Sequence, residues 1–213
     1  MPEATLAQQL SEFAAEVRSD GAPIVVRASV RLRILDVLGI AVAATELDTS
    51  ASVLGFVSRQ GGSEEAASVG LDARVPASWA AFANGVLAHS LDFDDTHLPS
   101  VLHPSAAVVP AGLAVAEALG VDGAALTDAV AAGIETTIRV GMAGYDHDSG
   151  NSIYFEHGQH ATSICGTIGA AVTAAMLHGL DPDGIVNAIG IAASMASGVI
   201  EGNRTGGTVK RLH

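Results

Sequence analysis

The amino-acid sequence predicts an all-α protein, a multi-helix domain over residues 1–213. Apolar residues recur with the period of an α-helix along almost the whole chain. Strand-like segments do not alternate with helical ones, which excludes a doubly wound, dinucleotide-binding fold. Hydrophobic residues make up 49 % of the chain but aromatic residues only 4 %. Alanine, valine and glycine therefore dominate the apolar composition, which suits helices whose backbones approach closely.

Glycine and proline separate the first three predicted helices. The apolar face of the first consists of Leu6, Leu10, Phe13, Ala14 and Val17, and the helix stops at 21–23. The second begins at Pro23, where a missing N–H costs nothing, and runs to about Thr45. Its buried face is expected at every fourth residue, namely Val26, Val30, Ile34, Leu38 and Val42. A short third helix covers 50–59.

The middle of the chain contains one segment without a helical pattern. Residues 66–75 are predicted as a strand or an irregular loop. Helices follow over 76–91, 105–119 and 122–140, with a polar, proline-broken segment at 92–104. Glu135 and Arg139 stand four residues apart, which predicts an ion pair on the surface of the third of these helices.

Small residues line one side of each of the last two predicted helices, 161–177 and 182–200, which follow a loop over 141–158. They are Gly166, Gly169, Ala170, Thr173 and Ala174 on the first, and Gly190, Ala193, Ser194 and Ser197 on the second. Since such residues allow close backbone contact, we expect both helices to be buried at the centre of the domain.

Charge, hydropathy and cysteine content restrict the possible partners. The chain has 23 acidic and 10 basic residues, a formal charge of −13, and no basic cluster, which excludes a nucleic-acid partner. The longest apolar runs, 164–177 and 185–200, are shorter than the roughly 20 residues of a membrane span. A single cysteine, Cys165, indicates a reducing compartment. With no signal peptide at the start, we expect a cytoplasmic protein without a membrane partner.

Polar side chains gather in three segments at predicted helix ends: 92–105, 156–162 and 206–213. Loops on a rigid scaffold are where function usually lies. Each segment also has a purely structural interpretation, as a solvated helix end, a helix cap or a charged chain end. Cys165 lies inside an apolar run and is interpreted as a small buried hydrophobe.

Two metal chemistries compete for these segments. Asp92, Asp94 and Asp95 could hold Mg²⁺ in a diphosphate-using enzyme, because aspartate oxygens suit hard cations. That chemistry requires a second acidic cluster, and downstream the sequence offers only the isolated Glu135, Glu156 and Glu201. A zinc site from His157, His160 and an aspartate is the other alternative.

Taken together, the three segments resemble the MmgE/PrpD family, which includes 2-methylcitrate dehydratase, cis-aconitate decarboxylase and iminodisuccinate epimerase. The strings that carry the resemblance are Ala83-Asn84-Gly85, HSLDFDDT from His89 to Thr96, His103-Pro104-Ser105, Val109-Pro110-Ala111, Gly133-Ile134-Glu135, GQHAT from Gly158 to Thr162, Gly169-Ala170-Ala171, and KRLH from Lys210 to His213. They cover essentially the whole chain in the right order.

The resemblance implies a helical domain that lacks the α/β lid of the family, and metal-free acid–base chemistry without a cofactor. It implies His103, Asp92, His160 and Lys210 as catalytic residues, and Thr96, Lys210 and Arg211 as substrate-binding residues. The implied partners are a small di- or tricarboxylate, a second copy in a homodimer, and a lid that could be a separate chain.

The implied activity is that of a lyase or isomerase similar to 2-methylcitrate dehydratase, with dehydration, decarboxylation and epimerisation left open. Each reaction builds negative charge beside a carboxylate, which fixed donors and cations can stabilise without a metal. Against a charge of −13, a polyanion needs a local positive pocket, which we expect from Lys210, Arg211, His103 and His160. The alternative is a non-catalytic, truncated or split-gene helical fragment.

Overall fold

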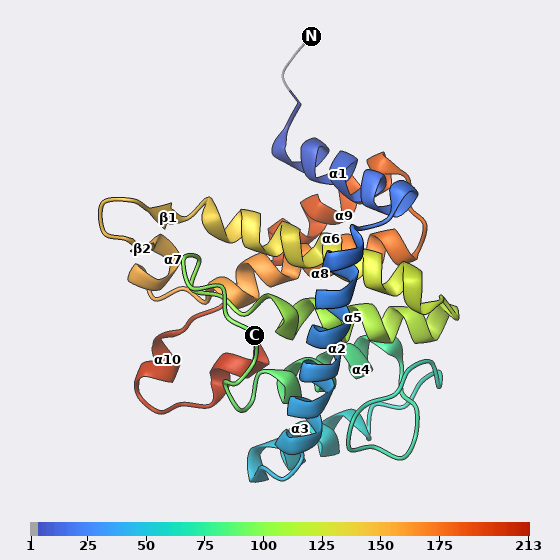
Figure 1. The fold of residues 1–213 in the computed structure, drawn as a ribbon. Helices are drawn as coiled ribbons and strands as arrows, with labels where there is room; N and C mark the ends of the chain where they lie inside the picture. The colour runs from blue at the N-terminus through green and yellow to red at the C-terminus, as the bar shows by residue number, and fades with distance from the viewer. Residues whose placement is uncertain (1–3) are drawn as a thin grey trace.

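The prediction of an all-α domain is confirmed by a computed structural model, which describes residues 4–213 (Figure 1). Its helices are α1 (Leu6–Asp20), α2 (Ile24–Ala44), α3 (Asp48–Val57), α4 (Ala77–Ala88), α5 (Pro104–Leu119), α6 (Gly123–Met142), α7 (Ile153–Glu156), α8 (Ala161–Leu177), α9 (Pro182–Met195), α10 (Glu201–Arg204) and the 3₁₀-helix η1 (Val209–Leu212). The strands β1 (Tyr145–Asp146) and β2 (Asn151–Ser152) form a small antiparallel hairpin.

Side chains near the helix ends explain several of the boundaries. Thr5 and Gln8 form a capping box at α1, in which each side chain bonds the other residue's backbone. Asp122 and Asp181 accept backbone N–H groups at the starts of α6 and α9. Gly120 ends α5 in the left-handed conformation that glycine adopts without strain.

Helix α8 is the central element and contacts α5, α6 and α9. Its small-residue face lies against α6, where Thr137 Oγ1 and the Gly133 carbonyl oxygen leave no room for a Cβ on Gly169. Thr173 is fully buried and donates hydrogen bonds to the carbonyls of Ala129 and Gly169. The predicted burial of α8 is therefore confirmed, and absent side chains let its backbone approach α6.

The predicted burial of the last helix is wrong. The small residues Gly190, Ala193, Ser194 and Ser197 are exposed, and α9 packs on its neighbours through Ile185, Ile189 and Ala192. Small side chains fit both a close contact and a solvated surface, so they did not identify the buried side. The helix also ends at Met195, because the following residues pair with the segment before α8, including a Gln159–Val199 bridge.

The buried face of α2 is only partly as predicted. Val30 is buried, but Val26, Leu38 and Val42 are exposed, and the other core contacts come from Val37, Ile40, Ala41 and Ala44. A row of every fourth residue drifts by about 40° per step around a helix of 3.6 residues per turn. Over the length of α2 this drift carries the row from the core to the surface.

The remaining differences lie in short segments. Residues 66–75 form an irregular loop closed by one Ala66–Val75 bridge, so the non-helical prediction is confirmed. The hairpin β1–β2 and the short helices α7, α10 and η1 were not predicted, because four residues or fewer carry no periodicity. The Glu135–Arg139 ion pair is confirmed at 2.7 Å. Within 4–213, the helices are too short or too polar to cross a bilayer.

Close packing of α6 on α8 predicts that Gly169→Ala lowers the free energy of unfolding by about 1–3 kcal/mol, since the new methyl group has no space. The control is Gly190→Ala on α9, where a Cβ would meet nothing within 4 Å. Alanine should stabilise that exposed site by about 0.5–1 kcal/mol through its helix propensity. Urea denaturation of both variants measures the changes, and an undiminished stability of Gly169→Ala would contradict the packing.

Candidate active site

Three segments that are distant in the sequence meet at one end of the central helices. His89 directly follows α4, His103 directly precedes α5, and His160 directly precedes α8. The 3₁₀-helix η1 brings Lys210 against the same place, where its Nζ lies 2.5 Å from Oδ1 of Asp92. Two helix N-termini therefore face the region where Lys210 supplies a cation, an arrangement favourable to negative charge.

Lys210 is the only lysine in the chain, and it is buried against Asp92. Asp92 has a φ of 58°, in the left-handed region that aspartate tolerates better than most residues. Partial burial acts to raise the pKa of Asp92, but the Lys210 hydrogen bond and charge, helped by His103 and His89, hold it below its ordinary value. The pair therefore stabilises the fold above the unfolded pKa of about 4, and this contribution is lost as pH falls through the folded pKa.

The hydrogen bonds of His103 assign its tautomer. Its Nδ1 lies 3.3 Å from the Asp94 carbonyl oxygen, which can only accept, and 3.3 Å from Oγ1 of Thr96. The proton therefore sits on Nδ1, and Nε2 keeps a lone pair, 3.8 Å from Oδ1 of Asp92. The backbone N–H of His103 donates to Oγ1 of Thr162 at 3.0 Å, which ties the start of α5 to the start of α8.

A buried histidine–aspartate pair lies behind His103. His89 Nδ1 is 2.7 Å from Oδ2 of Asp94, and both side chains are almost completely buried. The His89 ring contacts that of His103 edge-on, with ring centres 4.9 Å apart, and stacks on that of His160 at 5.4 Å. Three imidazole rings thus form one cluster, with a buried carboxylate holding the middle ring.

Asp95 has a different role from its two neighbours. It accepts hydrogen bonds from the backbone N–H and the hydroxyl of Ser105 and so caps the first turn of α5. The other partner of its carboxylate is the guanidinium of Arg33 on α2. The three aspartates therefore do not form one metal-binding face, which removes the basis of the diphosphate alternative.

His160 is buried, and neither ring nitrogen has a hydrogen-bond partner among residues 4–213. Burial, followed by the positive charges around it, lowers its pKa to about 3. His160 is therefore neutral near pH 7 and adds no charge to the expected positive pocket. Cys165 is buried as predicted, and burial raises the pKa of its thiol to about 11, so the thiol stays protonated.

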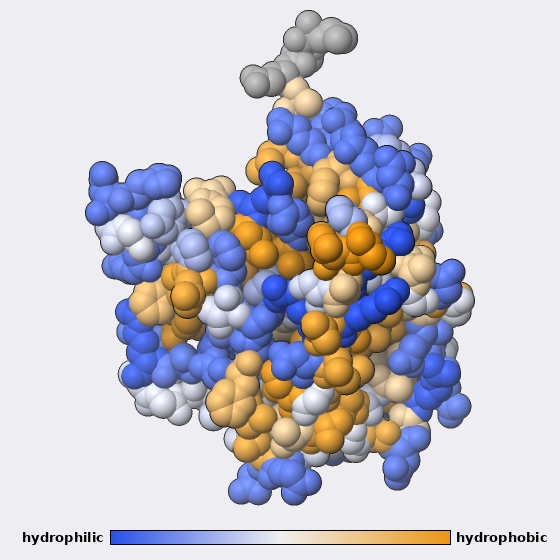
Figure 2. Space-filling model, in the orientation of Figure 1, coloured by the Kyte–Doolittle hydropathy of each residue, from blue (hydrophilic) through white to orange (hydrophobic). Residues whose placement is uncertain are grey.

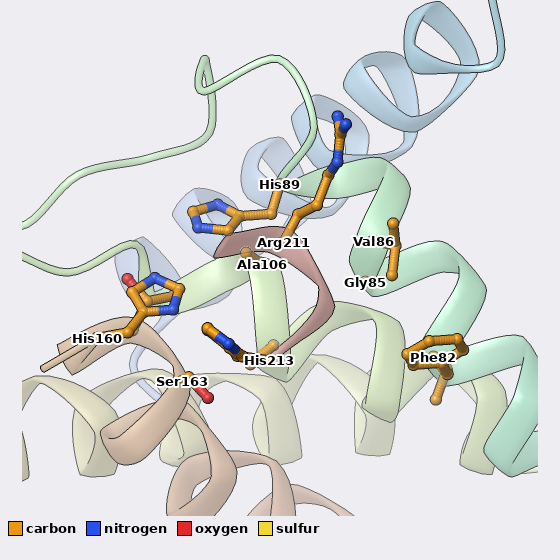
Figure 3. A pocket seen from close by; sticks show the side chains of 12 residues that line it. Phe82, Gly85, Val86, His89, Ala106, His160, Ser163, Arg211 and His213 are labelled. Atoms are coloured by element: carbon orange, nitrogen blue, oxygen red, sulfur yellow. The ribbon is translucent and has the colours of Figure 1, made fainter. Parts of the chain in front are cut away.

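A cavity of about 140 Å³ opens between His160 and the end of α4 (Figure 3). One wall is apolar and consists of Phe82, Gly85 and Val86 from α4 with Ala106 from α5. The other wall is polar and includes His89, His160, Ser163, Arg211 and His213. In Figure 3 the Arg211 guanidinium points away from His160, toward the side where it contacts the Ser90 carbonyl oxygen at 3.4 Å.

Four side chains could together hold a metal ion: His89, Asp92, Asp94 and His103 offer ligand atoms within 4.8 Å of one another. The ammonium of Lys210 already lies on Asp92, so a divalent cation there would meet a positive charge. The zinc alternative from His157 and His160 is not assembled in the described part of the chain, where His157 is exposed.

The predicted site residues Asp92, Thr96, His103, His160 and Lys210 thus lie in one continuous cluster, and Arg211 lines the adjoining cavity. Sequence reasoning missed the roles of His89, Asp94 and Thr162. His89 and Asp94 stand five residues apart at the end of a helix, and such a spacing does not indicate a buried pair. The one available signal was that Asp92, Asp94 and Asp95 have different sequence neighbours, which is compatible with a different role for each.

Comparison with known proteins identifies the family of the chain. Residues 8–213 match the family model described as the MmgE/PrpD N-terminal domain. The chain is 38 % identical over 146 residues to cis-aconitate decarboxylase of Mus musculus, covering 67 % of this chain and 28 % of the relative. It is 39 % identical over 129 residues to cis-aconitate decarboxylase of Homo sapiens, covering 59 % and 26 %.

A third relative, cis-aconitate decarboxylase of Aspergillus terreus, is 32 % identical over 138 residues, covering 62 % of this chain and 27 % of the relative. The aligned part of the chain spans a little over a quarter of the length of each of these relatives. The family model, in contrast, covers nearly all of the sequence. The chain belongs to the MmgE/PrpD family.

Proposed function

We propose that the chain carries the proton-transfer half of a lyase site for a small di- or tricarboxylate. The observation that supports this most directly is the contact of a proton carrier with a buried cation through one carboxylate. His103 Nε2 and Lys210 Nζ lie 3.8 Å and 2.5 Å from the same oxygen of Asp92. An ammonium has three donors, so Lys210 can hold Asp92 and a substrate carboxylate together.

In the proposed reaction, electrons accumulate on a substrate carbon next to a carboxylate. In a decarboxylation the bond to the departing carboxylate breaks, carbon dioxide leaves, and protonated His103 delivers its proton to the electron pair left on carbon. In a dehydration neutral His103 takes a proton from carbon, the bond from the neighbouring carbon to the hydroxyl group breaks, and that group leaves with a proton as water. In an epimerisation His103 takes a proton from one face of the carbon, and a proton returns to the opposite face. Lys210 and the helix N-termini stabilise the anion in each case. The names of the relatives favour the decarboxylation of cis-aconitate.

The site is open on one side, because Asp92 and Thr96 are exposed. We propose that an α/β lid, in the same chain or as a separate chain, completes it and excludes water during the reaction. A cytoplasmic location is proposed as well, on the grounds of the single, buried Cys165.

We further propose that the protein is a homodimer and that α2 forms the interface. Apolar residues lie on every side of helix α2, among a few charged ones, which is unusual for a surface helix. Exposed seam residues lie alternately three and four positions apart, the spacing of a coiled coil; they are Val25, Ala28, Leu32, Leu35, Gly39 and Val42. Leu32 and Leu35 are 68 % and 67 % exposed, and Figure 2 shows hydrophobic surface where Figure 1 places α2.

The seam is complementary to itself in the antiparallel direction. A two-fold axis between Arg33 and Ile34 would set Leu32 of one copy against Leu35 of the other. The same axis would set Val25 against Val42, at the two ends of the seam. Between these contacts, Ala28 of one copy would lie against Gly39 of the other. Self-complementarity about a two-fold axis is the signature of a symmetric dimer, so a second copy is the occupant that fits this face.

The role of Lys210 predicts that Lys210→Met weakens citrate binding more than tenfold, because the buried cation is lost. The pKa of Asp92 should rise in this variant, since burial is then opposed only by the charges of His103 and His89. Calorimetry measures the first change and carboxyl ¹³C NMR the second. Arg59→Met, which removes an exposed cation from the end of α3, serves as the control. Equal citrate affinity in both variants would contradict the role.

The role of His103 predicts a loss of about 10²- to 10⁴-fold in kcat for His103→Ala, measured as carbon dioxide release from cis-aconitate. Affinity for cis-aconitate should change little, because Lys210 remains. A destabilised His103→Ala protein with normal turnover per folded molecule would instead identify His103 as a helix-entry residue. If no substrate in a panel of cis-aconitate, 2-methylcitrate and iminodisuccinate is turned over, with or without a lid domain, the chain is the non-catalytic fragment.

The antiparallel seam predicts that Leu35→Glu converts the dimer to a monomer in analytical ultracentrifugation, whereas Leu119→Glu, at an exposed leucine of α5, does not. A dimer that ignores Leu35→Glu uses another surface, and a wild-type monomer disproves the dimer itself.

A further inference from the structure

The cavity beside His160 contains a glycine that its surroundings do not require. Gly85 lies in the interior of α4, where glycine destabilises a helix relative to alanine. A Cβ added there would lie 3.6 Å from the Ala106 carbonyl oxygen, an ordinary van der Waals contact, and would meet no other atom of neighbouring segments within 4 Å. Close packing of α4 on α5 therefore does not explain the glycine.

The space in front of Gly85 belongs to the cavity of about 140 Å³. An apolar cavity of about 150 Å³ in another protein accommodates benzene, so this one has room for roughly six heavy atoms. Its wall beside Gly85 is formed by Phe82, Val86 and Ala106 and suits a hydrocarbon group. In Figure 3 Phe82 and Val86 lie on the other side of the cavity from the rings of His89 and His160.

The polar wall of the cavity indicates which chemical group the far end of a bound hydrocarbon arm carries. His160 is 2 % exposed, and both of its ring nitrogens lack a partner within residues 4–213, as does Nε2 of His89. Leaving such buried groups unpaired is costly, which favours a ligand that bonds them. A neutral imidazole has one N–H, and a carboxylate oxygen is the acceptor that a small polycarboxylate can supply.

We propose that this cavity is a specificity subsite for a carboxymethyl arm of the substrate, with Gly85 leaving space for the methylene group and His160 donating to the arm's carboxylate. The proposal rests on the proposed function, because it adds a second anchor beyond the one supplied by Lys210. The arm enters between α4 and the start of α8, while the carbon that exchanges a proton stays beside His103. In the decarboxylation of cis-aconitate the arm's carboxylate leaves as carbon dioxide, and its electron pair shifts through the double bond to the carbon that His103 protonates. Gly85 is then the residue that determines which substituent of a substrate the site accepts.

Three probes that share the same pair of cis carboxylates measure what the arm contributes to binding, apart from the rest of the ligand. Maleate has two cis carboxylates and no arm, citraconate adds a methyl group, and cis-aconitate adds the whole carboxymethyl arm. The wild-type protein should bind cis-aconitate more tightly than citraconate, and citraconate more tightly than maleate, in calorimetry. Lys210→Met should weaken all three to a similar extent, because they share the carboxylates that Lys210 binds.

The decisive variant is Gly85→Ala, which fits sterically and favours the helix. It should raise the melting temperature, weaken cis-aconitate by about tenfold through crowding of the arm, and leave maleate unchanged. Gly190→Ala, at an exposed glycine of α9 with no atom within 4 Å, should raise the melting temperature without changing any affinity. His160→Phe should reduce the affinity for cis-aconitate to that for citraconate, because the donor to the arm is lost.

The outcomes distinguish the subsite from the function on which it rests. If maleate binds through Lys210 but Gly85→Ala binds cis-aconitate as tightly as wild type, the subsite is wrong and the carboxylate site stands. The subsite is equally wrong if Gly85→Ala weakens all three probes alike, because its effect is then not confined to the arm. If none of the probes binds the wild-type protein, the proposed function fails and the subsite fails with it.

Discussion

The contact between α6 and α8 at Gly133 and Gly169 is the constraint on which the rest of the structure depends. Without side chains at these points the two backbones meet directly, and Thr137 and Thr173 satisfy carbonyl groups inside the contact. Helix α5 packs on the other side of α8. The N-termini of α5 and α8 are thereby fixed next to each other. His103 and His160 stand at those two N-termini, so the arrangement of the imidazole rings is set by backbone packing rather than by the loops around them.

Three neighbouring aspartates divide the work of joining this scaffold to the polar cluster. Asp95 fastens α5 to Arg33 of α2, Asp94 holds His89 in the interior, and Asp92 meets Lys210 at the surface. Residues 92–95 therefore contact three different parts of the structure, namely helices α2 and α5, the imidazole cluster and the Lys210 ammonium. The left-handed backbone conformation of Asp92 turns the chain at the first of these three residues.

The sequence predicted much of the fold because a long helix shows its apolar periodicity over many residues. Helix α8 was located at both ends, because seventeen mostly small and apolar residues run without a break between two polar segments. The buried sides of α2 and α9 could not be predicted in the same way. Helix α2 has apolar residues on every side, and small residues on α9 suit either environment. Which side is covered depends on neighbours that the local pattern does not contain.

For the candidate site, the family resemblance identified His103, His160 and Lys210 but not the buried pair of His89 and Asp94 between them. His103 precedes a proline, Lys210 precedes an arginine, and His160 follows a glycine by two residues, so each stands out at a helix boundary in the sequence. His89 and Asp94 are ordinary members of the same string until folding buries them 2.7 Å apart. The neutral state of His160 was also out of reach, because its pKa of about 3 arises first from burial.

The ion pair between Asp92 and Lys210 joins residues that are 118 positions apart in the chain. Closing a loop of this length costs conformational entropy, and a partly exposed ion pair contributes too little to offset that cost alone. The packing of the helices must therefore bring the two residues together, with η1 placed against α4. The ion pair is thus a late contact in folding, and its formation reports that the scaffold beneath it is already assembled.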